Sequence, residues 1–188
     1  MNLADKLTSI RIILIPVFVS LLIYSRAHTY LKHIVTVVFV IAILSDFFDG
    51  LAARIRREKS DFGQILDPLA DKLLLFSAFV SLYIFRQTLP FTFKMPLGLV
   101  LIVVSRDLII LIGVVIINLL RREAIMSPSP WGKLTTFFQM ATILALLLNL
   151  PFFPWIWKGA AIFTLISGIN YFLRGVRALN ADSKSSYR

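Results

Sequence analysis

Long apolar stretches alternate with short polar segments along the whole chain. Each apolar stretch approaches or exceeds the roughly 20 residues that a helix needs to cross a membrane. The segments between them carry charges or proline, and none is long enough to hold a second domain. The pattern predicts an all-α integral membrane protein, with one domain over residues 1–180 and a polar tail at 181–188. Six transmembrane helices are expected, at about 7–24, 30–53, 65–86, 96–120, 131–150 and 153–173.

Composition narrows the class of protein further. Hydrophobic residues make up 58% of the 188 residues and charged residues 16%, with a mean hydropathy of +0.83. Soluble domains average about 45–50% apolar and about 25% charged residues. These values argue against a soluble globular enzyme, and they exclude a disordered chain. Because the chain has no cysteine, a disulfide framework, a thiolate zinc site and a cysteine nucleophile are excluded as well.

The distribution of lysine and arginine predicts the orientation in the membrane. With the N-terminus inside, thirteen of the 20 basic residues fall on the cytoplasmic side and five on the opposite side. The remaining two, Lys72 and Arg106, lie within expected helices. Cytoplasmic loops of membrane proteins carry an excess of lysine and arginine. Both termini are therefore expected in the cytoplasm. The net charge of +10 follows this topology and does not form a separate nucleic-acid-binding domain.

Four aspartates lie in or at the ends of the second and third apolar stretches: Asp46, Asp49, Asp67 and Asp71. A charge in a membrane helix costs about 2.5–3.5 kcal/mol on insertion scales and by default signals function. The spacings i, i+3 and i, i+4 put each pair on one helix face, near the same cytoplasmic loop. Four carboxylates without thiolates suit Mg²⁺ or Mn²⁺. Their charge is enough for two ions, the arrangement used for displacement at phosphorus.

Two other interpretations of these aspartates remain. They can be structural ion pairs, Asp46 or Asp49 with Arg54 and Asp67 with Lys72. They can also belong to a small cation transporter, which needs carboxylates near the bilayer midplane and an exit on the far side. Against both, four carboxylates carry more charge than two cations neutralise, and they gather at one interface beside a basic loop.

Small residues and an arginine accompany the aspartates. Gly50, Ala53 and Gly63 would let a helix or a ligand approach the backbone closely. Arg54 stands one turn beyond Asp49, where its planar fork could hold a phosphate. Together these residues read D-x2-D-G-x2-A-R-x8-G-x3-D-x3-D. At all eight fixed positions this run resembles the motif of the CDP-alcohol phosphotransferase family.

The resemblance implies a specific fold and reaction. The fold would have six transmembrane helices around a polar, metal-binding cavity that opens to the cytosol. CDP-diacylglycerol would donate a phosphatidyl group to an alcohol and release CMP. The four aspartates would hold the metal ions, and Asp71 would also act as the general base. The cytidine diphosphate pocket would be lined by Gly50, Ala53, Arg54, Asp61, Gly63 and Thr8, the last from an N-terminal amphipathic segment at 1–11.

Two later segments bear on the acceptor alcohol. The runs Ser105-Arg106-Asp107 and Gly132-Lys133-Leu134-Thr135-Thr136 resemble bacterial phosphatidylglycerophosphate synthases. That resemblance implies a bacterial inner membrane, an active site facing the cytosol and sn-glycerol 3-phosphate as acceptor. Homodimers are common among related proteins. Arg106, Lys133 and Arg121 are the cations that would bind the acceptor phosphate. The alternative for Arg106 is a structural ion pair with Asp107.

Two departures leave the acceptor open. The synthases commonly have Arg-Glu where this chain has Arg106-Asp107, and one lysine of their G-K-x-K-T run is replaced by Thr135. Both departures resemble the CDP-alcohol type of cardiolipin synthase, whose acceptor is phosphatidylglycerol. Inositol phosphate and serine are further candidate acceptors.

Overall fold

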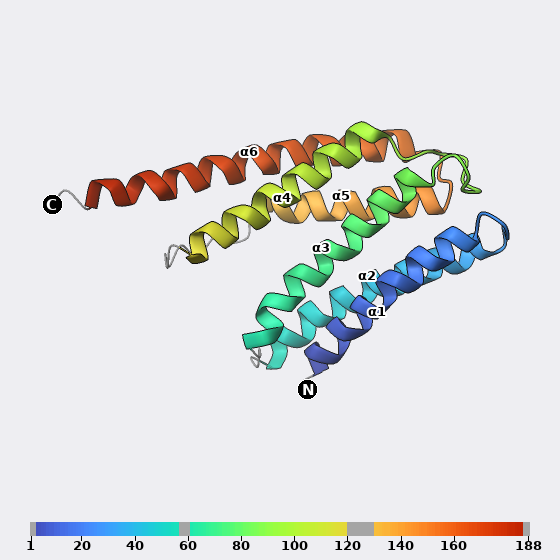
Figure 1. Ribbon diagram of the computed structural model, residues 1–188, viewed down its shortest axis with the longest axis horizontal. Helices are drawn as coiled ribbons and strands as arrows, with labels where there is room; N and C mark the ends of the chain where they lie inside the picture. Colours follow the sequence, from blue (N-terminus) through green and yellow to red (C-terminus); the bar gives the residue numbers. More distant parts are fainter. Residues whose placement is uncertain (1–2, 57–60, 120–129, 186–188) are drawn as a thin grey trace.

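The computed structural model describes the backbone of residues 3–56, 61–119 and 130–185, and the side chains of residues 12–45, 72–113 and 130–174 (Figure 1). Within these ranges the chain is all-helical, as the apolar pattern predicts. The helices are α1 (Leu3–Tyr24), α2 (Leu31–Arg56), α3 (Asp61–Ile84), α4 (Leu97–Leu119), α5 (Pro130–Leu147) and α6 (Phe153–Ser185).

Several helix ends extend beyond the apolar pattern. Helix α2 continues to Arg56 and α3 already begins at Asp61, so both halves of the aspartate motif are helical. Helix α6 continues to Ser185, well beyond the last apolar stretch and into the segment expected as a polar tail. Helical hydrogen bonds form between backbone groups, so a helix can continue into a polar segment beyond the last apolar residue.

The connections between helices alternate between two ends of the molecule. In Figure 1, the α1–α2, α3–α4 and α5–α6 connections lie at one end. The N-terminus, the end of α2 and the start of α3 lie toward the other end. Asn149 shapes the α5–α6 connection, because its φ of 53° ends α5 in the left-handed conformation that asparagine tolerates. Its Oδ1 accepts a hydrogen bond from the Thr92 amide at 2.7 Å, which joins two of these connections.

The helices pack in two groups that share a core. Helix α1 packs on α2 and α3, while α6 packs on α5 and α4, and contacts of α5 with α2 and α3 join the groups. Phe18 of α1 and Phe39 of α2 are fully buried with ring centroids 5.6 Å apart. Phe79 of α3 and Ile143 of α5 are buried in the same cluster. The core therefore joins both groups along their length.

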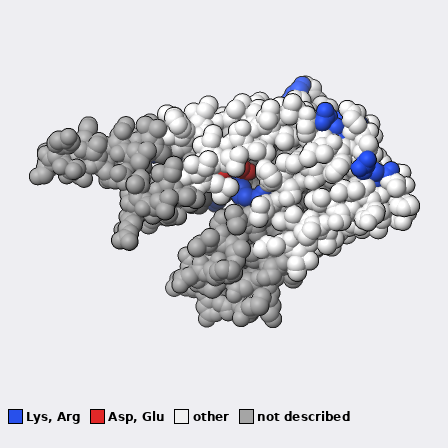
Figure 2. Space-filling view, in the orientation of Figure 1, with Lys and Arg blue, Asp and Glu red and all other residues white. Residues whose placement is uncertain are grey.

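The outer faces of the helices are apolar as well. Ile13 is 62% exposed, Phe137 65% and Phe172 63%. Figure 2 shows a largely uncharged surface over the described residues, with basic atoms gathered at the end that holds the three connections. Extended apolar patches on a protein surface mark contact with a membrane or a partner. Among the described residues, Phe153–Arg174 of α6 is long and apolar enough to cross a membrane, and three shorter apolar helices accompany it.

Candidate functional site

The aspartate motif lies at facing ends of two consecutive helices. Asp46 and Asp49 belong to the last three turns of α2, and Asp67 and Asp71 to the first three turns of α3. The backbone is helical through both pairs, so the spacings i, i+3 and i, i+4 do place each pair on one helix face. The side chains lie outside the described residues, and so do those of Gly50, Ala53, Arg54, Asp61, Gly63 and Thr8. Their convergence therefore stays a prediction.

A metal site at this motif rests on donor chemistry. The residues with described side chains contain no group of three or more His, Asp or Glu that could hold a metal ion. The four motif aspartates fall outside that set, and they offer only carboxylate oxygens. Oxygen donors in excess of neighbouring cations fit Mg²⁺ or Mn²⁺ and do not fit a soft metal.

A buried ion network lies next to the motif half of α3. Asp107 of α4 is 6% exposed, and its Oδ1 accepts hydrogen bonds from Lys72 Nζ at 2.8 Å and from Arg106 Nη1 at 2.6 Å. Asp107 is the one acidic residue whose side chain is described. Figure 2 shows acidic and basic atoms together in a hollow, apart from the basic atoms at the end that holds the three connections. Among the described side chains, this network holds two cations and one carboxylate.

The network includes one partner that the sequence indicated and one that it did not. The pairing of Arg106 with Asp107 was one of the two expected outcomes for that arginine, and the structure contains it. The sequence offers Asp67 as an ion-pair partner for Lys72, but the side chain of Asp67 lies outside the described residues. Its described partner is Asp107, 35 residues away on another helix. The sequence indicates only that Lys72 has some anionic partner, because a lysine within an apolar helix needs one in the bundle. It does not indicate which residue that partner is.

Arg106 crosses from α4 to two other helices. Its Nη2 donates to Ser167 Oγ of α6 at 2.8 Å. A Cβ atom built on Gly132 of α5 would lie 3.6 Å from Nη2, and one built on Gly168 of α6 would lie 3.5 Å from Cγ. The absence of side chains at these two glycines makes room for the arginine. Its Nε is buried and has no hydrogen-bond partner among the described residues.

The candidate acceptor residues are placed unequally. Arg106 is 7% exposed, within the network. Lys133 is exposed on α5, directly after the glycine that adjoins the Arg106 guanidinium. Arg121 lies outside the described residues. The structure thus brings α5 close to Arg106 at Gly132, the residue before Lys133. The expected role of Arg121 stays a prediction.

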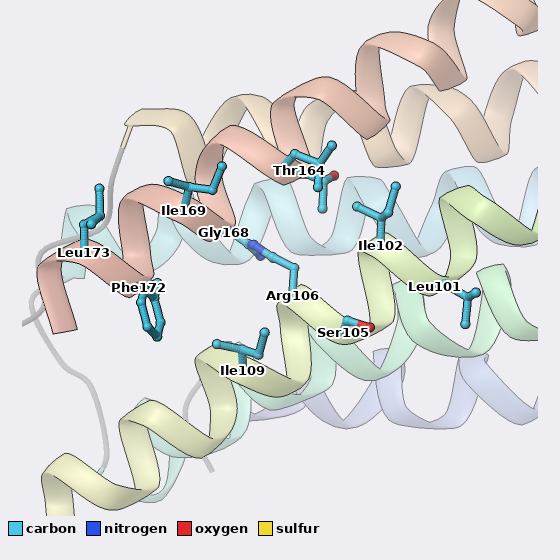
Figure 3. A pocket seen from close by; sticks show the side chains of 11 residues that line it. Leu101, Ile102, Ser105, Arg106, Ile109, Thr164, Gly168, Ile169, Phe172 and Leu173 are labelled. Carbon is cyan, nitrogen blue, oxygen red and sulfur yellow. The ribbon is translucent and has the colours of Figure 1, made fainter. Parts of the chain in front are cut away.

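An apolar groove runs between α4 and α6 beside Arg106. It has a volume of about 460 Å³, and Figure 3 shows Arg106 extending from α4 toward Gly168 with apolar side chains on both sides. The groove opens on the outer face, since Leu101, Ile109 and Phe172 are all largely exposed. Its lining suits a hydrocarbon chain, and Arg106 contributes to that lining.

Comparison with known proteins settles the family. Residues 1–169 match the sequence profile of the CDP-alcohol phosphatidyltransferase family. The chain belongs to this family. The resemblance in the aspartate motif is therefore confirmed over nearly the whole protein.

Individual relatives in the CDP-alcohol phosphatidyltransferase family carry more specific names. A protein of Mycobacterium tuberculosis named "Probable phosphatidylglycerophosphate synthase" is 33% identical over 94% of this chain and 82% of its own length. The CDP-diacylglycerol–glycerol-3-phosphate 3-phosphatidyltransferase of Bacillus subtilis is 32% identical over 97% of this chain and 99% of its own length. The enzyme of the same name from Aquifex aeolicus is 34% identical over 77% of this chain and 75% of its own length.

The space around Arg106 leads to a prediction about Gly132. Alanine should be tolerated there, because a Cβ atom 3.6 Å from Nη2 is an ordinary contact. Leucine should displace the guanidinium from Ser167 and destabilise the protein by about 1–3 kcal/mol, as overpacking of a core does. The thermal midpoint of the purified protein in detergent measures this. Gly113→Leu is the matched control, because a Cβ atom at Gly113 meets nothing within 4 Å. Equal midpoints for the two leucine variants would contradict the prediction.

Proposed function

We propose that this protein transfers the phosphatidyl group of CDP-diacylglycerol to sn-glycerol 3-phosphate, giving phosphatidylglycerophosphate and CMP. The observation that carries this proposal is family membership over residues 1–169 together with the complete eight-position aspartate motif. Relatives named for this reaction come from several bacteria, and one of them aligns over 99% of its length. The activity belongs to phospholipid biosynthesis.

The motif residues divide the chemistry among them. Asp46, Asp49, Asp67 and Asp71 would hold Mg²⁺ or Mn²⁺, two ions in all. When bound, the ions would neutralise the negative charge of the diphosphate. The fork of Arg54 would hold a diphosphate oxygen. The small residues Gly50, Ala53 and Gly63 would admit the nucleotide close to the backbone, with Asp61 and Thr8 completing its pocket.

The reaction would be a direct displacement. The Asp71 carboxylate accepts the proton of the acceptor hydroxyl, which is too weak an acid to lose it unaided. The hydroxyl oxygen then forms a bond to the phosphorus that carries the diacylglycerol. The bond from that phosphorus to the bridging oxygen breaks, and the bridging oxygen leaves as part of CMP. No covalent enzyme intermediate is needed.

The acceptor phosphate would bind at the cations beyond the motif. Among the described side chains, the network of Lys72, Asp107 and Arg106 holds two cations and one carboxylate. Lys133 directly follows Gly132, which adjoins the Arg106 guanidinium. Arg121 is the third proposed contact. A small dianion such as glycerol 3-phosphate suits buried and half-buried cations, since charge-assisted hydrogen bonds to phosphate are strong where water is excluded.

A second candidate has one observation in its favour. The apolar groove beside Arg106 could take an acyl chain of a lipid acceptor, as a cardiolipin synthase acting on phosphatidylglycerol would require. Purified protein with CDP-diacylglycerol and a panel of acceptors separates the two, with CMP release and lipid product as readouts. We expect turnover with glycerol 3-phosphate. Turnover with phosphatidylglycerol alone would establish the second candidate, and inositol phosphate and serine complete the panel.

The proposed setting is the bacterial inner membrane, with six spans in one domain, a polar cavity open to the cytosol and both termini inside. The apolar outer faces and the thirteen-to-five distribution of basic residues support it. We also propose a homodimer. Because the cavity lies in the membrane and opens to the cytosol, CDP-diacylglycerol would reach the site from the bilayer and the acceptor from the cytosol.

Removal of any motif carboxylate should nearly abolish activity. Asp71→Asn should lower kcat about 10²–10⁴-fold, the usual worth of a general base. Asp46→Asn, Asp49→Asn and Asp67→Asn each replace a charged carboxylate ligand by a neutral amide. Each variant should therefore release little CMP at any Mg²⁺ or Mn²⁺ concentration. Asp182→Asn, on the terminal part of α6, is the control and should keep full activity. Full turnover of the wild-type protein in excess chelator would contradict the metal assignment.

Lys133 should serve the acceptor and not the donor. Its loss removes one charge-assisted bond of about 1.5–3 kcal/mol, equivalent to roughly 10–150-fold in affinity. Lys133→Ala should therefore raise KM for glycerol 3-phosphate by about that factor and leave KM for CDP-diacylglycerol unchanged. Arg106→Lys should do the same, because lysine keeps the charge and loses the fork. The matched control is Lys158→Ala, an exposed lysine near the start of α6. A selective defect toward CDP-diacylglycerol would refute the assignment.

The topology can be tested with single cysteines, since the chain has none of its own. His28→Cys lies in the α1–α2 connection, and Glu58→Cys lies between the two halves of the motif. An impermeant thiol reagent applied to intact cells should label position 28 and leave position 58 unlabelled until the cells are opened. Labelling of position 58 alone would reverse the proposed orientation.

A further inference from the structure

The carboxylate of Asp107 serves two cations at once. Its Oδ1 accepts Lys72 Nζ at 2.8 Å and Arg106 Nη1 at 2.6 Å. The side chains of Arg106 and Asp107 are 8% and 9% exposed, and that of Lys72 is 21% exposed. A carboxylate needed only to neutralise Arg106 would have no use for a second cation. The shared oxygen therefore points to a role on the Lys72 side of the network.

The network is a polar tie between α3 and the α4–α6 group. Lys72 lies on α3, Asp107 on α4, and Arg106 continues to Ser167 on α6 at 2.8 Å. Leu74, Leu75 and Ala78 of the same helix are buried in the apolar core. Apolar packing is non-directional, whereas a charge-assisted hydrogen bond fixes both distance and direction. The ion pair is thus the contact best able to fix the rotation of α3 about its own axis.

Lys72 directly follows Asp71 on the same continuous helix. Successive residues of a helix are related by a fixed angle, so any rotation that moves Lys72 moves Asp71 and Asp67 equally. We propose that Asp107 is a positioning residue which, through Lys72, sets the rotation of α3 and so the placement of the Asp67–Asp71 face. This inference rests on the proposed function of that face as a metal site.

Lys72→Met is the decisive variant, because it leaves the neutral Arg106–Asp107 pair in place and removes only the tie to α3. Mn²⁺ binding to the purified protein, followed by the paramagnetic resonance of free Mn²⁺, is the first readout. We expect at least about tenfold weaker Mn²⁺ binding and a matching fall in kcat. Lys72→Arg keeps the cation and should restore both. Unchanged Mn²⁺ binding in Lys72→Met, or no recovery in Lys72→Arg, would overturn the inference.

A double-mutant cycle and a stability control complete the test. Asp107→Asn breaks the tie to Lys72 and also the ion pair with Arg106, so it should weaken Mn²⁺ binding at least as much as Lys72→Met does. The double variant should bind Mn²⁺ no more weakly than Asp107→Asn alone, since the tie to α3 is already lost. Additive losses would contradict the inference. Thr142→Val removes a buried hydroxyl that bonds only within α5, and it should lower the thermal midpoint without affecting Mn²⁺ binding. An equal Mn²⁺ defect in Thr142→Val would mean that the effect is one of general stability.

This experiment separates the inference from the proposed function. Mn²⁺ binding needs no acceptor, so an incorrect acceptor leaves the test intact, and kcat is then measured with the alcohol that the wild-type protein uses. Wild-type protein that releases no CMP with any acceptor would refute the proposed activity. Wild-type protein that binds no Mn²⁺ would refute the metal site, and the positioning role with it.

Discussion

Charged side chains inside an apolar helical bundle need partners, and that requirement organises this molecule. Removing a charge from water costs several kcal/mol, which only a close counter-charge with good geometry offsets. Lys72 and Arg106 meet the requirement with a single carboxylate, Asp107. Because Lys72 lies on α3 and Asp107 on α4, the ion pair that neutralises Lys72 also links the two helix groups. The apolar residues supply most of the buried surface, and the ion network supplies direction.

The same requirement explains the small residues around the network. Gly132 and Gly168 face the side chain of Arg106, where a residue larger than alanine would compete with the arginine for space. Nε remains without a partner among the described residues, so the guanidinium retains one unused donor. An unsatisfied buried donor costs about 1–3 kcal/mol. An anion that accepted a hydrogen bond from Nε would remove this cost, as the proposed binding of the acceptor phosphate at Arg106 would.

The sequence predicted helices better than contacts. Apolar stretches located all six helices because burial in lipid or protein selects the same residues. The apolar pattern did not predict the end of α6, because the extension of a helix beyond its apolar residues depends on backbone hydrogen bonds. The Arg106–Asp107 pair was foreseeable from adjacency. The Lys72–Asp107 pair was not, because a contact 35 residues apart depends on how helices pack. The motif aspartates were found by spacing alone, and their convergence remains a prediction.

The network also bears on why the acceptor is hard to infer from sequence. The residues that would bind its phosphate are a buried arginine and an exposed lysine on neighbouring helices, with an apolar groove on the outer side. The cations favour any phosphate, whether of a small alcohol or of a lipid, because charge recognition does not depend on the rest of the molecule. What separates a soluble acceptor from a lipid acceptor is whether a hydrocarbon chain can pass the stem of Arg106. In this structure the stem of Arg106 lies beside Gly168 in the lining of that groove, so it is the side chain that an acyl chain of a lipid acceptor would have to pass.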